Sequence, residues 1–150
     1  MATDNRAMIR RFIDEVWNQG RTDVIDQMFA SHFVDHVVGL PNPLQGPDEL
    51  KQFVTTYRAA LPDLTFMIDE MFVTGDRVIL RWSAMGTHRG EWMGIAPTNR
   101  KVSASGVSIF RLSDAKVQEA WSYWDYLGFV TQLGVTLHRP ATVSQPATQA

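Results

Sequence analysis

The sequence contains no cysteine. This absence excludes disulfide bonds, a catalytic thiolate and a cysteine-ligated zinc site, and nothing in the composition suggests an oxidising compartment. Long apolar runs are missing too, since no segment approaches the roughly 20 residues that a membrane-spanning helix needs. Residues 1–12 carry three arginines and one aspartate without the apolar stretch of a signal peptide. We therefore expect a cytoplasmic protein with no membrane partner.

An excess of positive charge is also absent. The chain has 14 lysine and arginine residues against 16 aspartate and glutamate residues, and its pI is near 6.0. A protein that binds phosphate backbones usually carries a basic face, so nucleic acid is not expected as a partner. The 150 residues, 45% of them hydrophobic, suit one globular core. We expect a single domain over residues 1–138, followed by a polar, disordered tail over 139–150.

Motifs for common cofactors are missing as well. There is no dinucleotide-binding glycine fingerprint, no Walker phosphate loop and no G-x-S-x-G nucleophile elbow, so no cofactor is predicted. His32 and His36 are four residues apart, which would suit a metal site on a helix. The surrounding residues indicate a strand instead, where four residues span roughly 13 Å, too far for two ligands of one metal. No metal site is predicted.

Apolar residues recur at helical spacing in the N-terminal part of the chain. The first such pattern covers Met8–Trp17, and Gly20 follows as a stop signal. A short second helix is predicted to start at Thr22 as N-cap and to lead into a strand over Phe33–Val38. A third helix is expected over Pro47–Pro62, because proline suits a first helical position and also ends a helix.

From residue 64 onward the apolar period changes to that of strands. Short turn signals separate the first two and the last two of these strands, and a longer connection over Arg89–Arg100 joins the middle pair. A closing helix over Tyr126–Leu133 has Asp125 as its N-cap. Helices followed by a meander indicate an α+β fold, with a curved antiparallel sheet covered by N-terminal helices. The predicted strands are Leu64–Val73, Arg77–His88, Lys101–Leu112 and Lys116–Asp125.

Alternate residues of a strand share a face, and the face expected to meet the helices carries small side chains. These are Ala104, Gly106 and Ser108 in one strand, and Ala120 and Ser122 in the next. Small residues leave space, so we expect an apolar pocket for a small organic molecule between sheet and helices. In the alternative, long side chains fill this volume, namely those of Phe66, Met67, Trp82 and Trp124.

Eight residues are predicted to bind a hydrophobic ligand or substrate in this pocket. Trp82 shares a strand face with His88, which would place an indole and an imidazole on one wall. Trp92, in the connection between strands, is interpreted as a lid over a planar substrate. The predicted set is Tyr57, Phe66, Trp82, Trp92, Ser108, Phe110, Ser122 and Trp124.

The connection between the second and third strands of the meander is similar to a known motif. GTHRGEWMGIAPTNRKV, at Gly86–Val102, resembles the G-x-H-x-G-x-x-x-G-x-x-P-T-x-R segment of the SnoaL-like polyketide (ester) cyclases. Further similarities are FVDH at Phe33–His36, YRAALPDL at Tyr57–Leu64 and D-x-L-G-x-x-x-Q-L-G at Asp125–Gly134. The resemblance implies the nuclear transport factor 2-like fold, a cone-shaped α+β barrel. It also implies a homodimer or homotetramer formed through the outer sheet face.

The resemblance further implies a mechanism that this chain does not reproduce. In the family an aspartate on the last strand acts as acid/base in an intramolecular aldol ring closure, beside a histidine on the preceding strand. The resemblance places Ser122 at the aspartate position and Ser108 at the histidine position. A serine hydroxyl is too weak a base at neutral pH to replace either group. The fold is therefore expected to transfer, whereas the reaction does not transfer directly.

Other titratable groups are therefore the candidates for acid/base catalysis. His88 is the first choice, because it lies within the most specific motif and on the strand face of Trp82. His36 and Asp35 are adjacent on a strand, so they point to opposite faces and only one of them can line the pocket.

Glu70 and Asp125 complete these candidates. Glu70 shares the strand parity of Ile68 and points inward unless a bulge turns it to solvent. A role as helix N-cap explains Asp125 without catalysis. The predicted catalytic set is His88, His36, Glu70 and Asp125.

Three functions remain open at this point. The first is a cyclase, or related lyase or isomerase, acting on a hydrophobic polyketide-like carbonyl compound. The second is a non-catalytic small-molecule binding protein, which the two serines favour. The third is an epoxide hydrolase-like enzyme, which would need an inward Asp-Arg-Asp relay that we cannot assemble from this sequence.

Overall fold

The computed structural model describes residues 2–141, with side chains from residue 4. A six-stranded sheet has the strand order β2-β1-β6-β5-β4-β3. The meander strands pair antiparallel, whereas β1 pairs in parallel with β6. The strands are β1 (Phe29–Val37), β2 (Leu44–Gln45), β3 (Thr65–Thr74), β4 (Arg77–Thr87), β5 (Lys101–Ser113) and β6 (Lys116–Trp124).

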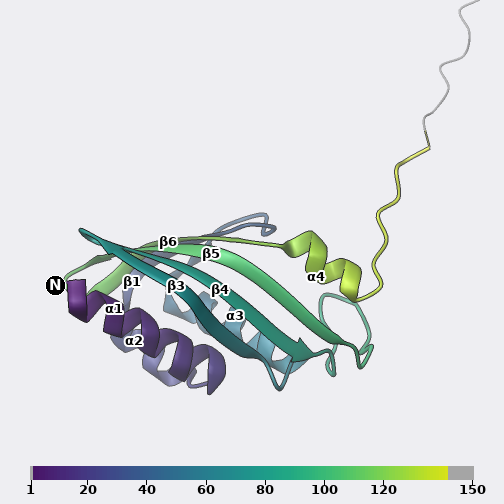
Figure 1. The fold of residues 1–150 in the computed structure, drawn as a ribbon, viewed down its shortest axis with the longest axis horizontal. Coiled ribbons are helices and arrows are strands. Elements are labelled where there is room, and N and C mark those ends of the chain that lie inside the picture. Colours follow the sequence, from purple (N-terminus) through teal and green to yellow (C-terminus); the bar gives the residue numbers. More distant parts are fainter. Residues whose placement is uncertain (1, 142–150) are drawn as a thin grey trace, which may run out of the picture.

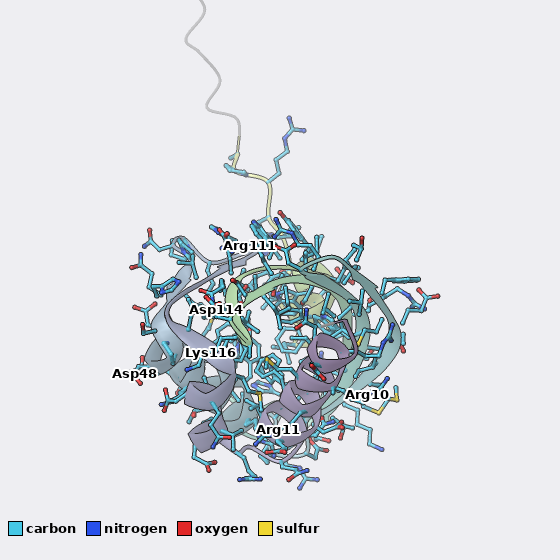
Figure 2. All side chains as sticks on the ribbon, turned by 90° about the vertical axis from the view of Figure 1, so that its left-hand side faces the viewer. Arg10, Arg11, Asp48, Arg111, Asp114 and Lys116 are labelled. Carbon is cyan, nitrogen blue, oxygen red and sulfur yellow. The ribbon has the colours of Figure 1, made fainter. Side chains whose placement is uncertain are left out.

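Helices cover one face of this sheet, and a further helix lies at its end after β6 (Figure 1). Viewed from the left-hand side of Figure 1, the sheet forms an arch over the helices, and the labelled side chains of Arg10, Arg11 and Asp48 point outward (Figure 2). The helices are α1 (Ala2–Arg11), the π-helix η1 (Phe12–Asn18), the 3₁₀ turn η2 (Thr22–Val24), α2 (Ile25–Met28), α3 (Gly46–Ala60) and α4 (Tyr126–Gln132).

The predicted α+β fold is confirmed, with a sheet that is curved but not closed, because its edge strands β2 and β3 do not pair. The predicted bounds of the meander strands agree with the structure to within one residue. The first strand begins at Phe29, because the chain passes directly from α2 into β1. Thr22 lies inside the 3₁₀ turn, whose N-cap is Arg21, so the prediction of Thr22 as N-cap is wrong.

One buried cluster of apolar side chains joins the sheet to the helices. The segment η1 contributes Phe12, Ile13, Val16 and Trp17, which the helical period places on one side. Within residues 2–141, no helix is long and apolar enough to cross a membrane. Most of the tail predicted to be disordered, residues 142–150, lies outside the described residues.

Candidate active site

A cavity lies between the concave face of the sheet and the covering helices, with about 840 Å³ of unfilled space including its opening. Among its described lining residues only Asp35 and Tyr57 are titratable, and no lysine, arginine or histidine is present. The lining consists of Phe12, Ile13, Trp17, Phe29, Asp35, Val37, Leu50, Phe53, Tyr57, Leu61, Leu64, Phe66, Leu80, Trp82, Ala84, Ala104, Ser108, Phe110, Ser122, Trp124 and Phe129.

The strand register places the polar lining residues side by side. Ser108 of β5 lies directly opposite Ser122 of β6, and Ser122 in turn lies beside Val37 of β1. Asp35 shares the face of Val37, because residues two apart on a strand point the same way. The parallel pairing of β1 with β6 therefore delivers a carboxylate to the two serines.

Gly106 makes room for two tryptophan side chains of the cavity wall. A Cβ atom at this position would lie 2.6 Å from Cζ2 of Trp82, 2.7 Å from Cβ of Trp124 and 2.5 Å from the carbonyl oxygen of Tyr123. Only a residue without Cβ permits this approach. Glycine at position 106 thus allows the Trp82 indole and the Cβ atom of Trp124 to pack against β5.

A continuous chain of hydrogen bonds ends at the carboxylate. The indole Nε1–H of Trp82 donates to Oγ of Ser108 at 3.1 Å. The Ser108 hydroxyl donates to Oγ of Ser122 at 3.3 Å, and the Ser122 hydroxyl donates to Oδ1 of Asp35 at 3.2 Å. Four side chains from four neighbouring strands are thereby linked inside an otherwise apolar cavity.

Burial raises the pKa of the Asp35 carboxyl group to about 6, because lost hydration disfavours the charged form. The hydrogen bond from Ser122 and the neighbouring His36 oppose this rise and lower the pKa. Only 7% of Asp35 is exposed. A carboxylate with a pKa near 6 is ionised at neutral pH and is a stronger base than an ordinary aspartate. The site can therefore accept and return a proton.

The other polar group of the cavity is the hydroxyl of Tyr57, which lies among aromatic side chains. The ring of Tyr57 lies 6.1 Å from that of Trp124 and 6.4 Å from that of Phe129. Burial raises the pKa of the Tyr57 hydroxyl above its usual range, so this group stays protonated and able to donate a hydrogen bond. Trp92 packs 5.1 Å from Phe129 and is buried, but it does not line the cavity. The indole interpreted as a lid instead supports the aromatic wall from behind.

The other residues predicted to bind substrate do line the cavity. Six of them lie on the strand faces that point inward, and Tyr57 lies on α3. Binding of a substrate by these residues stays a prediction. They are Tyr57, Phe66, Trp82, Ser108, Phe110, Ser122 and Trp124.

His88 is completely buried, but it does not line the cavity. Its Nδ1 accepts a hydrogen bond from the backbone N–H of Thr98 at 3.2 Å, and its backbone N–H donates to the carbonyl of Arg100. Its Nε2 has no hydrogen-bond partner among the described residues. The prediction that His88 lies on the pocket wall is therefore wrong. His88 instead joins the two ends of the β4–β5 connection through these hydrogen bonds.

Three other predicted acid/base residues also lie away from the cavity. His36 is exposed on the outer sheet face, 3.0 Å from Oε1 of Glu119. A register shift between Ile68 and Glu70 turns the Glu70 carboxylate outward, where it pairs with Arg81 at 2.9 Å. Of the two orientations left open for Glu70, the structure has the one with the bulge, because the register shift reverses the parity. Asp125 is exposed and caps α4 by accepting a hydrogen bond from Gly128 N–H, which confirms its interpretation as N-cap.

Similarity to known proteins agrees with this architecture. Residues 7–133 match the family model of the SnoaL-like polyketide cyclases. The chain belongs to this family. Within residues 2–141, the SnoaL-like fold brings together no group of three or more histidine, aspartate and glutamate residues that could hold a metal ion.

Relatives of this SnoaL-like chain include an aklanonic acid methyl ester cyclase of Streptomyces peucetius. It is 27% identical over 129 residues, which cover 85% of this chain and 88% of the relative. The structure of a candidate SnoaL-like polyketide cyclase from Jannaschia sp. CCS1 has a TM-score of 0.83 at 23% identity and covers 91% of this chain and 95% of its own. The structure of AclR of Streptomyces galilaeus, a candidate hydroxylase, has a TM-score of 0.80 at 25% identity. The match covers 89% of this chain and 98% of AclR.

Asp35 is the site residue that the sequence analysis left unassigned. Its signal was present, because Phe33, Asp35 and Val37 share a strand face and the two apolar residues are buried. A charged residue between two buried apolar residues of one face indicates an inward carboxylate. The parity of Phe33 and Val37 would have selected Asp35 over the neighbouring His36.

Proposed function

We propose that this protein is a cyclase that closes a ring in a hydrophobic, polyketide-like carbonyl compound, with Asp35 as its acid/base. The observation that carries this proposal is a single carboxylate in an apolar cavity, at a pKa suited to proton transfer near neutral pH. The resemblance supports it, since the family's acid/base aspartate corresponds to Ser122. Here Ser122 is hydrogen-bonded to Asp35 of the adjacent strand. The carboxylate is supplied by β1 instead of β6.

The proposed reaction is an intramolecular aldol addition. Asp35 removes a proton from a carbon next to a carbonyl group, and the resulting enolate carbon attacks a second carbonyl of the same molecule. One C–H bond breaks and one C–C bond forms. The protonated Asp35 then returns its proton to the new alkoxide, so the reaction needs no oxidant or reductant. The protonated hydroxyl of Tyr57 supplies a hydrogen-bond donor to a substrate oxygen.

The cavity lining favours an uncharged substrate. It contains no cationic side chain among the described residues, so a free carboxylate would be buried unpaired beside Asp35. Aromatic rings on several walls suit a planar, unsaturated ligand. A methyl ester of the kind named for the Streptomyces peucetius relative meets the first condition, because esterification removes the charge of the acid. We therefore expect the ester to be accepted and the corresponding free acid to be rejected.

Substitution of the carboxylate tests the assignment. With aklanonic acid methyl ester as the first substrate, Asp35→Asn should lower kcat by about 10²-fold or more, the usual effect of losing a general base. The wild-type kcat/KM should rise with pH through an apparent pKa of about 6, because Asp35 must be ionised to act as the base. His36→Asn, on the same strand but the opposite face, is the matched control and should retain activity within about twofold. Full activity of Asp35→Asn would show that another group is the base.

A non-catalytic binding protein is the second candidate, and one observation favours it. No second acid/base group stands beside Asp35 among the described lining residues, apart from the hydroxyl of Tyr57. In that case the methyl ester would quench the tryptophan fluorescence of the cavity without being converted. Epoxide hydrolysis receives no support from the geometry, because the described lining contains one carboxylate and no arginine.

We further propose a homodimer formed through the outer face of the sheet. Large apolar side chains are exposed there, including Phe72 at 56% and Tyr123 at 57%. Val107 lies directly opposite Tyr123 in the β5–β6 pair and is also exposed. Exposed apolar surface of this kind often marks a protein interface.

A further inference from the structure

The hydrogen bonds beside Asp35 all point in one direction. An indole N–H donates and cannot accept, whereas an ionised carboxylate accepts and cannot donate. Trp82 therefore occupies one end of the chain as a pure donor, and Asp35 occupies the other as a pure acceptor. Each serine hydroxyl has a single proton. Because Ser108 accepts from the indole, its proton is directed to Ser122, whose own proton is directed to Oδ1 of Asp35.

We propose that Trp82 and Ser108 are positioning residues, which act through Ser122 to orient Asp35 and to stabilise its ionised form. The hydrogen-bond chain occupies Oδ1, and no other hydrogen bond reaches the Asp35 carboxylate among the described residues. Oδ2 is then the oxygen that takes up and releases the proton. The catalytic meaning of this inference rests on the proposed function, but the effect on Asp35 can be measured without a substrate.

Packing holds Trp82, the first donor of the hydrogen-bond chain, in place. The Trp82 ring lies 5.0 Å from that of Phe66, and Gly106 leaves the space that the indole occupies. Trp82 is 8% exposed, Ser108 6% and Asp35 7%. Water therefore has little access to replace a lost hydrogen bond, and hydrogen bonds in such surroundings are stronger than in water.

Few other charges act on Asp35, so the loss of one bond from the hydrogen-bond chain can be detected in the pKa of Asp35. From α3 the titratable group facing the cavity is Tyr57. His36 on the same strand and Glu119 on β6 lie on the outer face and are hydrogen-bonded to each other. The short strand β2 contributes no ionisable side chain. The remaining charged groups of α2 and α3 do not line the cavity and are Asp26, Asp48, Glu49, Lys51 and Arg58.

The decisive measurement is the titration of Asp35 by NMR of its ¹³C-labelled carboxyl carbon in the ligand-free protein, with Asp35→Asn to assign the signal. Removal of a bond that favours the ionised form raises the pKa. We expect Ser122→Ala to raise the apparent pKa by about 1 unit, and Ser108→Ala and Trp82→Phe by about 0.3–0.5 unit each. Trp82→Phe added to Ser122→Ala should produce no further rise, because the chain is already interrupted.

Matched variants separate the chain from general effects on the cavity. Trp124→Phe removes an indole from the same wall but outside the chain, so it should leave the Asp35 pKa unchanged. Ser108→Thr retains the hydroxyl and should restore the wild-type value that Ser108→Ala loses. The proposal is overturned if Trp82→Phe and Trp124→Phe give the same Asp35 pKa, or if Ser108→Ala and Ser108→Thr do.

The pH dependence of kcat/KM then tests whether the hydrogen-bond chain affects turnover. In Trp82→Phe and Ser108→Ala the apparent pKa of the acidic limb of kcat/KM should rise by the shift found by NMR. In Trp124→Phe this apparent pKa should equal the wild-type value, even where the size of kcat/KM changes because Trp124 lines the cavity. A limb that stays in place despite a shifted Asp35 titration overturns the positioning role. If the titrations follow expectation but Asp35→Asn remains fully active, the proposed function fails while the hydrogen-bond chain stands.

Discussion

Asp35 is held between two opposing effects. Burial disfavours its ionised form, whereas the hydrogen bond from Ser122 favours it. Burial prevails, and the pKa rises from 3.8 to about 6. The residue thus remains ionised at neutral pH, but at the expense of folding stability. This is a frequent property of catalytic groups, whose environment is arranged for reactivity.

The cost of this ionisation gives a prediction about stability. Because the folded pKa is raised, the folded state binds the proton more tightly than the unfolded state does, and the associated stability is lost as pH rises from about 4 to about 6. Asp35→Asn should therefore increase the free energy of unfolding at pH 7.5 by up to about 3 kcal/mol, and should change it little near pH 4. Urea unfolding at both pH values measures the difference. Glu70→Gln, an exposed carboxylate, is the control; an equal gain for both variants would contradict burial as the cause.

At the level of elements, register decides which side chains reach the cavity. The bulge in β3 turns Glu70 outward, and the parallel pairing of β1 with β6 turns Asp35 inward. The β4–β5 connection is tied across its base by His88 and Thr98. Gly106 of β5 provides the space for Trp82. β1, β3 and β5 thus each contribute through one position where the pairing or the side-chain volume departs from the regular antiparallel pattern.

Gly106 allows this view of the sheet to be tested. In Gly106→Ala the added methyl group would meet a backbone carbonyl of β6, the Cβ atom of Trp124 and the indole of Trp82, so the clash cannot be relieved by side-chain movement alone. We expect a loss of about 1–3 kcal/mol in the free energy of unfolding, as for other overpacked sites. Chemical denaturation measures it, with Ser105→Ala on the exposed face of β5 as control. Similar stability of the two variants would mean that β5 and β6 move apart easily.

The whole molecule presents two apolar regions with different expected uses. The inner region is the cavity, which the sheet forms together with η1 and α3. The outer region lies on the opposite face of the same sheet and exposes Val107 and Tyr123. Exposed apolar side chains on the uncovered face of a sheet are typical of a protein interface.

The expected partner is a second copy of the chain. Light scattering coupled to size-exclusion chromatography should give twice the 17.0 kDa mass of one chain for the wild type. The double variant Val107→Glu with Tyr123→Glu should give a single-chain mass, because negative charges of the two copies would be buried facing each other across the interface. Leu137→Glu, exposed outside the sheet, should remain dimeric. A single-chain mass for the wild type would rule out the proposed dimer.

The sequence by itself determined the elements and most of the cavity wall. Helical and strand periods depend on neighbouring residues, so the meander strands and the inward parity of Trp82, Ser108 and Ser122 were predictable. Whether a bulge occurs at Glu70 was left open by the sequence, because strand parity holds only where pairing is unbroken. The tertiary structure decided the acid/base candidate. Asp35 and Ser122 are 87 residues apart, and only the parallel docking of β1 on β6 brings them within hydrogen-bonding distance.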